Sequence, residues 1–211
     1  KINGISLTKS SMLAAESRPN KVVKANAEPI RIETSKYSLE ISNNGQFTSF
    51  KYGGKELINK KKNLPEFQVS GFNHEKRSFE KYRLGNAKYK NGKLLLKNGP
   101  FAVLFEVKAE EHYLAFKILK TKGFNSSDLT IFGFFGFLES AINVFPLDYM
   151  TDCGKSHTGE TNVKWKWKWA KGKDLPRGGF AFIHAATDDE YDEALHHIWV
   201  KENQPHPKIK G

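Results

Sequence analysis

The sequence predicts a mainly β protein, an antiparallel β-sandwich of about a dozen short strands followed by a single C-terminal helix. Segments with period-two alternation recur along the chain, and Asn-Gly or Gly-Gly turns separate them at close spacing. Only one segment, near the C-terminus, has helical periodicity. The 211 residues are 38% hydrophobic and 13% aromatic. This composition is sufficient for one large core without a disulfide or a metal.

Three regions are expected along the chain. Residues 1–28 are rich in Lys, Ser, Asn and Ala, which predicts a tether that is poorly ordered or lies along the surface. Residues 29–187 are predicted to form the sandwich. Residues 188–211 are predicted to form a helix and then a proline-containing linker toward a missing C-terminal domain.

The first two thirds of the sandwich are expected to be consecutive antiparallel strands. Strands are predicted at residues 30–34, 37–41, 47–50, 56–58, 67–72, 78–84, 87–90, 93–97, 101–109 and 113–119. Asn43-Asn44-Gly45 predicts a hairpin with a type I′ turn, because Asn and Gly tolerate positive φ, and Asn91-Gly92 predicts another hairpin. The strands between residues 30 and 58 are typical of a meander.

The later strands carry less regular patterns. Residues 129–138 are apolar on both faces, so we expect other parts of the chain to cover both. Gly133 and Gly136 interrupt this segment, which predicts bulges or close backbone approach. Residues 141–160 are expected to be a long irregular loop, a type of segment that is often functional. Residues 180–183 are predicted to form the last strand.

Residues 163–169 alternate tryptophan with lysine. In a strand, Trp165, Trp167 and Trp169 would share one face and the lysines the other. The indoles could form a platform for stacking on sugar rings, or they could be buried between the sheets or under a neighbouring domain. Large aromatic side chains are mostly buried, which favours the second alternative.

The predicted loop before this strand holds four further candidates for carbohydrate binding or interdomain contact, namely Asp148, Asp152, His157 and Glu160. Two carboxylates from one loop could supply the acid and the base of a glycoside hydrolase. Acidic residues in loops are usually solvated, however, so we assign no catalytic residue. Cys153 and His157 form at most half of a metal site.

The remaining histidines give no metal site by sequence spacing. His196 and His197 occupy neighbouring helix positions that face different directions, and His74, His112 and His184 are isolated in the sequence. We therefore expect neither a metal nor another cofactor.

One helix is predicted after residue 187. Thr187-x-x-Glu190 has the form of a capping box. The apolar residues that follow at helical spacing are Tyr191, Ala194, Leu195, Ile198 and Trp199. The helix should end before Pro205.

The net charge of +11 would attract polyanions, but most basic residues are spread singly along the chain, which favours a solvated surface. The chain has no Gly-rich phosphate loop, no Gly-x-Ser-x-Gly elbow, no His-Glu-x-x-His motif and no RNP-like motif, so nucleic acid is not an expected partner. No apolar run approaches the length of a membrane span. The single cysteine, Cys153, does not indicate a compartment.

The segment of residues 37–58, YSLEISNNGQFTSFKYGGKELI, resembles the opening strands of the galactose mutarotase-like β-sandwich, also called a supersandwich. The matching residues are Leu39, Ile41, Gly45, Phe50, Gly54, Lys55, Glu56 and Leu57. The closing run of residues 180–186, followed by a helix and Pro-His-Pro, is similar to the passage from such a sandwich into a catalytic domain.

The resemblance implies a non-catalytic N-terminal accessory domain of a secreted or periplasmic bacterial polysaccharide-degrading enzyme, a glycoside hydrolase or polysaccharide lyase. Its partners would be a polysaccharide or the catalytic domain of the same protein. The alternative is an independent carbohydrate-binding module for a glycan that could be anionic. A third reading is an aldose mutarotase, but no His or Glu of this chain aligns with the mutarotase catalytic pair. Whether the chain is itself an enzyme stays open.

Overall fold

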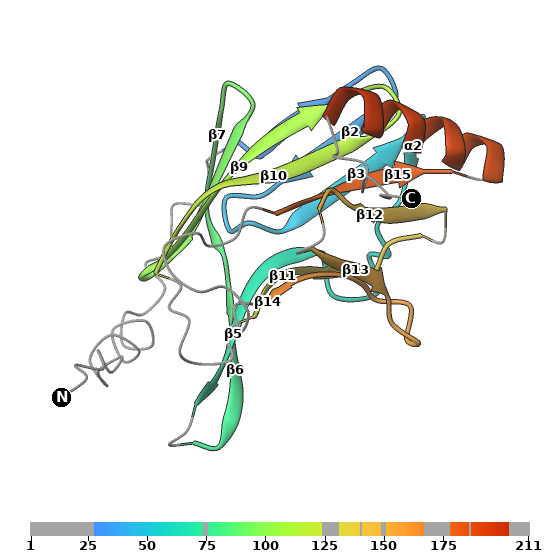
Figure 1. Ribbon diagram of the computed structural model, residues 1–211. Coiled ribbons are helices and arrows are strands. Elements are labelled where there is room, and N and C mark those ends of the chain that lie inside the picture. The colour runs from blue at the N-terminus through green and yellow to red at the C-terminus, as the bar shows by residue number, and fades with distance from the viewer. Residues whose placement is uncertain are drawn as a thin grey trace, which may run out of the picture.

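The computed structural model describes residues 28–73, 76–123, 131–139, 141–148, 151–166, 178–185 and 187–202. Within these ranges, fifteen strands form three antiparallel sheets, and one helix follows them near the C-terminus (Figure 1). For the described residues, the predicted fold class, an antiparallel β-sandwich with a single C-terminal helix, is confirmed. The predicted tether and the linker after the helix lie almost entirely outside the described residues.

The smallest sheet holds four strands in chain order. They are β1 (Ile30–Glu33), β2 (Tyr37–Ile41), β3 (Phe47–Tyr52) and β4 (Lys55–Glu56). The predicted β2–β3 hairpin is present, but its turn has positive φ only at Gly45, at 83°, so the type I′ prediction is wrong here. A Cβ at Gly45 would lie 2.0 Å from the carbonyl oxygen of Leu84, which is a second reason for glycine.

The six-stranded sheet forms one layer of the sandwich. Its order is β12 (Ile142–Pro146), β15 (Gly179–His184), β10 (Leu114–Lys122), β9 (Phe101–Ala109), β8 (Lys93–Asn98) and β7 (Gly85–Lys90). Asn91 and Gly92 join β7 to β8 with φ of 49° and 70°. Positive φ at both positions is what a type I′ turn requires, so this hairpin prediction is confirmed.

The five-stranded sheet forms the opposing layer (Figure 1). Its order is β13 (Asp152–Lys155), β14 (Thr161–Lys166), β11 (Ile131–Gly136), β5 (Glu66–Asn73) and β6 (Ser78–Arg83). The expectation that residues 141–160 form one irregular loop is wrong. β12 pairs with β15 and β13 pairs with β14, so neighbouring strands impose an extended conformation that the local sequence pattern does not indicate.

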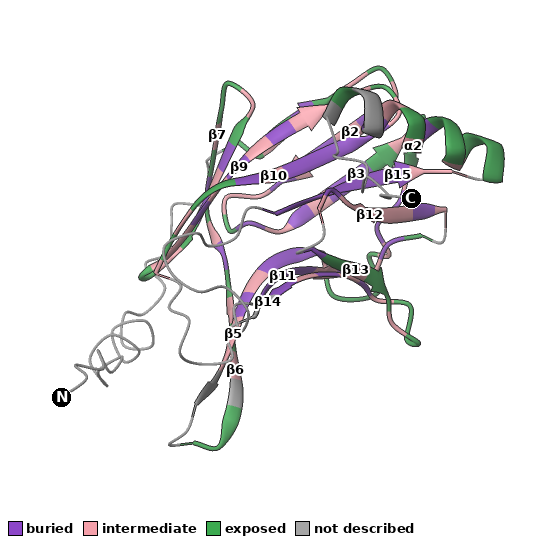
Figure 2. Ribbon diagram, in the orientation of Figure 1, coloured by how far each residue is buried: buried purple, intermediate pink, exposed green. Residues whose placement is uncertain are grey.

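The strands that face one another across the two layers carry many buried residues (Figure 2), and many of these are phenylalanines. The fully buried ones are Phe47, Phe50, Phe67, Phe105, Phe116, Phe132, Phe134, Phe180 and Phe182. The ring of Phe47, from the small sheet, lies 5.0 Å from that of Phe134 and 6.1 Å from that of Phe116. All three sheets therefore share one core.

The predicted helix is present as α2 (Asp188–Glu202), and the amide of Glu190 donates to Oγ1 of the predicted cap, Thr187, at 3.3 Å. Ala194 and Ile198 are buried in a second cluster that includes Ile183 of β15. The helix therefore covers the face of the six-stranded sheet that points away from the main core (Figure 1). Among the described residues, no helix has the length and hydrophobicity needed to cross a membrane.

Candidate functional site

The outer face of the five-stranded sheet is polar, although the same strands line the core. On the inner face, Phe134 of β11 pairs with Phe67 of β5, and both are fully buried. One residue further along β11, Phe135 points to the outer face and pairs with Glu66. The alternation of β5 places Gln68 on that outer face as well.

A groove of about 280 Å³ lies at one end of this outer face. Its lining consists of Gln46, Asn63, Leu64, Glu66, Gln68, Lys81, Arg83, Phe135, Gly136 and Glu160. These residues come from the β2–β3 turn, the segment before β5, strands β5, β6 and β11, and the residue before β14. Of the sequence-predicted candidates that the structure describes, Glu160 is the one that lines the groove.

The carboxylate of Glu66 organises the groove wall. It accepts hydrogen bonds from Nε2 of Gln68 at 2.7 Å and from Nε2 of Gln46 at 3.3 Å. It also accepts one from Nε of Arg83, with which it forms an ion pair. Glu66 is only 9% exposed, and a carboxylate buried to this degree needs such partners. The network fixes the orientation of both glutamine amides.

The aromatic element of the groove depends on glycine. A Cβ at Gly133 would lie 2.7 Å from Cε2 of Phe135 and 2.5 Å from the carbonyl oxygen of Val163. The ring of Phe135 therefore occupies the space into which a side chain at position 133 would project. A Cβ at Gly136 would meet Pro65 at 2.4 Å. The predicted close approach at both glycines of β11 is confirmed.

The tryptophan-lysine segment contributes to the core rather than to this groove, as far as the structure describes it. Strand β14 ends at Lys166, and Trp165 is 1% exposed. Its indole stacks on Phe132 at 4.8 Å, and its Nε1 donates to Oγ1 of Thr151 at 2.9 Å. For Trp165 the buried alternative is therefore correct. Trp167 and Trp169 lie outside the described residues.

The other predicted candidates are spread over the β13–β14 hairpin and the segment before it. Asp148 accepts a hydrogen bond from Oγ1 of Thr151 at 3.0 Å, Asp152 is exposed on β13 and His157 is exposed in the hairpin turn. Asp152 pairs with Lys164, four residues from Glu160. Four residues of strand correspond to roughly 13 Å between backbone positions, so Asp152 and Glu160 project from different parts of the hairpin.

Cys153 does not complete a metal site with His157. The cysteine packs against the main core from β13. Burial, with a further contribution from the negative charges of Asp152 and Asp148, raises the pKa of its thiol to about 12. The thiol is therefore protonated at neutral pH, and a protonated thiol is a poor nucleophile and a poor metal ligand.

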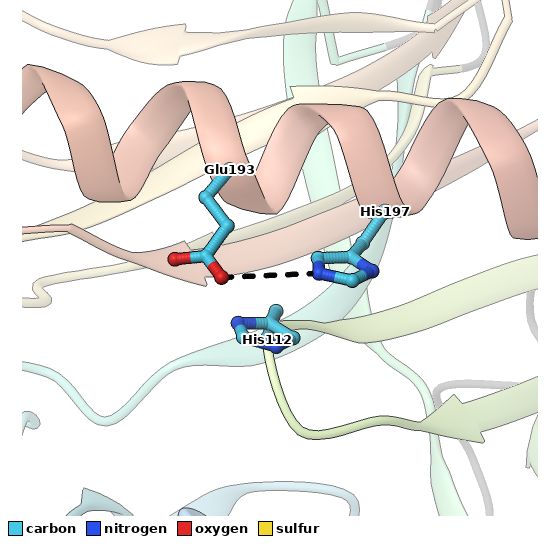
Figure 3. Close-up of side chains that lie close together, drawn as sticks. All are labelled: His112, Glu193 and His197. Atoms are coloured by element: carbon cyan, nitrogen blue, oxygen red, sulfur yellow. Dashed lines mark ion pairs between the residues drawn. The ribbon is translucent and has the colours of Figure 1, made fainter.

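Two histidines that are isolated in the sequence are not isolated in the structure. The ring of His184 stacks on that of Tyr52 at 4.0 Å, and the ring of His112 stacks on that of His197 at 4.2 Å. Glu193 lies beside His112 and His197 (Figure 3). For His112 the inference of isolation from spacing was wrong, because the fold brings the β9–β10 turn to the helix. His74 lies outside the described residues.

Sequence reasoning missed most of the groove. The alternation in Glu66-Phe67-Gln68 was a usable signal, since it places polar side chains opposite a core residue. Gln46 and Arg83 carried no such signal, because β-sheet pairing alone brings them to Glu66.

No protein-family model matches this sequence, and no curated protein matches it either. The resemblance to the galactose mutarotase-like sandwich therefore stays a prediction, and the case for function depends on the chemistry of the groove.

Proposed function

We propose that this chain is an accessory β-sandwich domain that binds glycan for a polysaccharide-degrading protein, and that the groove beside Phe135 receives a sugar ring. One observation carries the proposal. The groove combines an aromatic ring with amide, carboxylate and ammonium groups in a single polar depression.

These groups match the chemistry of a sugar. The C–H faces of a pyranose carry partial positive charge and stack on the negative face of an aromatic ring such as Phe135. Sugar hydroxyls both donate and accept hydrogen bonds. The amide of Gln68 can do the same, the carboxylate of Glu160 accepts and the ammonium of Lys81 donates. A volume of about 280 Å³ is at the lower limit of small-molecule pockets, which suits one ring of a longer chain.

The charges of the groove favour a neutral glycan. Glu66 and Glu160 offset Lys81 and Arg83, and Arg83 is already paired with Glu66. The overall charge of +11 is therefore not concentrated in this groove. A sulfated or uronate-containing polysaccharide would find no unmatched group of cations among the described lining residues.

The same network favours binding over catalysis. Three side chains direct hydrogen bonds at the carboxylate of Glu66, which suits a group that positions its neighbours. The resemblance of residues 37–58 to the supersandwich supports the same role, since that domain stands before a catalytic domain in bacterial glycoside hydrolases and polysaccharide lyases.

Isothermal titration against a panel of neutral, sulfated and uronate-containing polysaccharides tests the proposal. We expect a neutral glycan to bind, and Phe135→Ala to weaken its affinity at least about tenfold because a stacking platform is lost. Gln68→Ala should weaken binding less, by loss of one hydrogen-bonding side chain.

Leu119→Ala provides the matched control. Leu119 is 48% exposed on β10, in the opposite layer, so its truncation also removes exposed apolar surface but should leave glycan affinity unchanged. Circular dichroism on each variant separates loss of binding from loss of fold. Absence of binding to every glycan, or equal affinities for Phe135→Ala and the parent protein, would contradict the proposal.

A further inference from the structure

A cluster of three potential metal ligands lies on the opposite side of the protein, where α2 meets the turn between β9 and β10. His112 comes from this turn, and Glu193 and His197 come from one face of the helix (Figure 3). One ligand atom from each residue lies within 4.8 Å of the other two.

The three side chains already converge. Nε2 of His197 lies 4.0 Å from Oε1 of Glu193, since residues at i and i+4 share a helix face. The imidazole of His112 lies parallel to that of His197, with 4.2 Å between ring centroids and 6° between planes. To bind one cation, the ligand atoms would approach one another by about 1 Å, because tetrahedral bonds of about 2.0–2.1 Å place ligand atoms roughly 3.4 Å apart. At least one of the two stacked imidazoles would also turn about its side-chain bonds, because a nitrogen lone pair lies in the plane of its ring.

Both elements that supply the ligands are held in place. The carbonyl of His112 accepts a hydrogen bond from Oη of Tyr37 at 3.1 Å, and this hydroxyl in turn accepts one from the amide of His184 at 2.9 Å. On the helix, Ala194 and Ile198 are buried against the sheet. The ligands therefore need to rotate only about side-chain bonds, without movement of the backbone.

Glu193 is the carboxylate of the cluster, and Glu111 also lies close enough to His112 and His197 to interact with them electrostatically. The two neighbouring carboxylates of the turn have other cations beside them, since Glu111 pairs with Lys36 at 3.2 Å and Glu110 pairs with Lys201. A protonated lysine does not bind a metal, so neither Lys36 nor Lys201 is a candidate ligand. Glu193 is the residue that forms the ion pair with His197.

We propose that His112, Glu193 and His197 form a binding site for a divalent transition metal of the Zn²⁺ type, with a fourth position open to water. Two imidazoles, which are borderline donors, together with one carboxylate form a ligand set that suits Zn²⁺. The exposed position of Glu193 gives the ion access from solvent. The bound metal would tie the C-terminal helix to the β9–β10 turn, and a ligand that binds the folded state alone stabilises it.

Calorimetric titration of the chelator-treated protein with ZnCl₂ tests the site, together with thermal unfolding in the presence and absence of Zn²⁺. We expect one Zn²⁺ per chain and a higher melting temperature with the metal. His112→Ala, Glu193→Gln and His197→Ala should each weaken Zn²⁺ affinity at least about a hundredfold and abolish the Zn²⁺-dependent rise, since loss of a ligand exceeds the 10–100-fold effect of its outer-shell partners.

His196→Ala is the matched control. His196 is the exposed neighbour of His197 on the same helix and is not a member of the cluster. We expect its affinity for Zn²⁺ to stay within about twofold of that of the parent protein. Failure of the parent protein to bind Zn²⁺, or an equal loss of affinity in His196→Ala and His197→Ala, would overturn the proposal. Glu193→Gln keeps the shape of the side chain, so it tests the carboxylate even if an alanine variant unfolds.

Discussion

The two faces of the five-stranded sheet are built from the same strands but differ in chemistry. The inner face carries Phe67, Phe134 and Trp165, all at most 1% exposed. The outer face carries Gln68 and Phe135, which are half-buried and line a polar groove. Because successive residues of a strand point to opposite faces, one strand can serve stability on one side and binding on the other.

Aromatic rings have different neighbours on the two faces. In the core, aromatic rings contact one another, as Trp165 and Phe132 do. On the outer face, the ring of Phe135 lies over Gly133, which has no side chain to compete for the space. The inner arrangement maximises buried apolar area, whereas the outer one keeps an aromatic ring near the surface.

Trp165→Ala should give the largest effect on stability. It removes a fully buried indole and its hydrogen bond to Thr151, and we expect a loss of about 3–5 kcal/mol in unfolding free energy. Lys164→Ala, one residue away on the outer face, should change it by less than about 0.5 kcal/mol. Urea unfolding followed by circular dichroism measures both. Similar losses of unfolding free energy in the two variants would contradict the assignment of residue 165 to the buried face and residue 164 to the outer face.

Gly133→Ala should have an intermediate effect. The added methyl would lie 2.5 Å from the backbone oxygen of Val163, which cannot move cheaply, and would displace the Phe135 ring. We expect a loss of about 1–3 kcal/mol, as in other overpacked sites, together with weaker glycan binding.

Gly154→Ala is the control for this prediction. Gly154 also lies in the five-stranded sheet, opposite Asn162, and nothing lies within 4 Å of the position of an added Cβ. This variant should be neutral or slightly stabilising, by up to about 1 kcal/mol. A tolerated Gly133→Ala would show that the ring of Phe135 does not depend on this glycine.

Much of the fold could be predicted because its signals are local. Period-two alternation marked most strands, and Thr187 with Glu190 marked the start of the helix. The strands between residues 142 and 155 could not be found in this way, since β12 and β13 depend on pairing with β15 and β14. The turn at Gly45 was misjudged for a similar reason, because its environment includes the distant backbone of Leu84.

One part of the family resemblance has a local structural explanation. The carboxylate of Glu56 in Gly54-Lys55-Glu56-Leu57 accepts hydrogen bonds from the amide of Phe50 at 2.9 Å and from Oγ of Ser49 at 2.9 Å. It therefore holds β3 beside β4. A motif that closes a turn can recur in unrelated sandwiches, so this element supports the fold more strongly than it supports a sugar-related function.

The candidate sites could be predicted far less well than the fold. Glu160 was identified as a candidate, but Gln46, Glu66 and Arg83 meet only through strand pairing. The approach of His112 to His197 likewise depends on helix docking. Residues that are distant in the sequence and carry no shared periodicity give no sign of their contact until the sheets are assembled.

The thiol of Cys153 lies at the edge of the inner face. Its titration should give the smallest of these changes in unfolding free energy. Its pKa is raised from 9.0 to about 12, chiefly by burial. The unfolded thiol would thus ionise from about pH 9 while the folded thiol stays protonated, so its contribution to stability is present below pH 9 and is lost as the pH rises toward 12. Cys153→Ala lacks this titration. Between pH 8 and pH 10 the parent protein should lose about 1.4 kcal/mol relative to the variant in urea unfolding. Parallel pH profiles for the two proteins would mean that the thiol is as solvated in the folded state as in the unfolded chain.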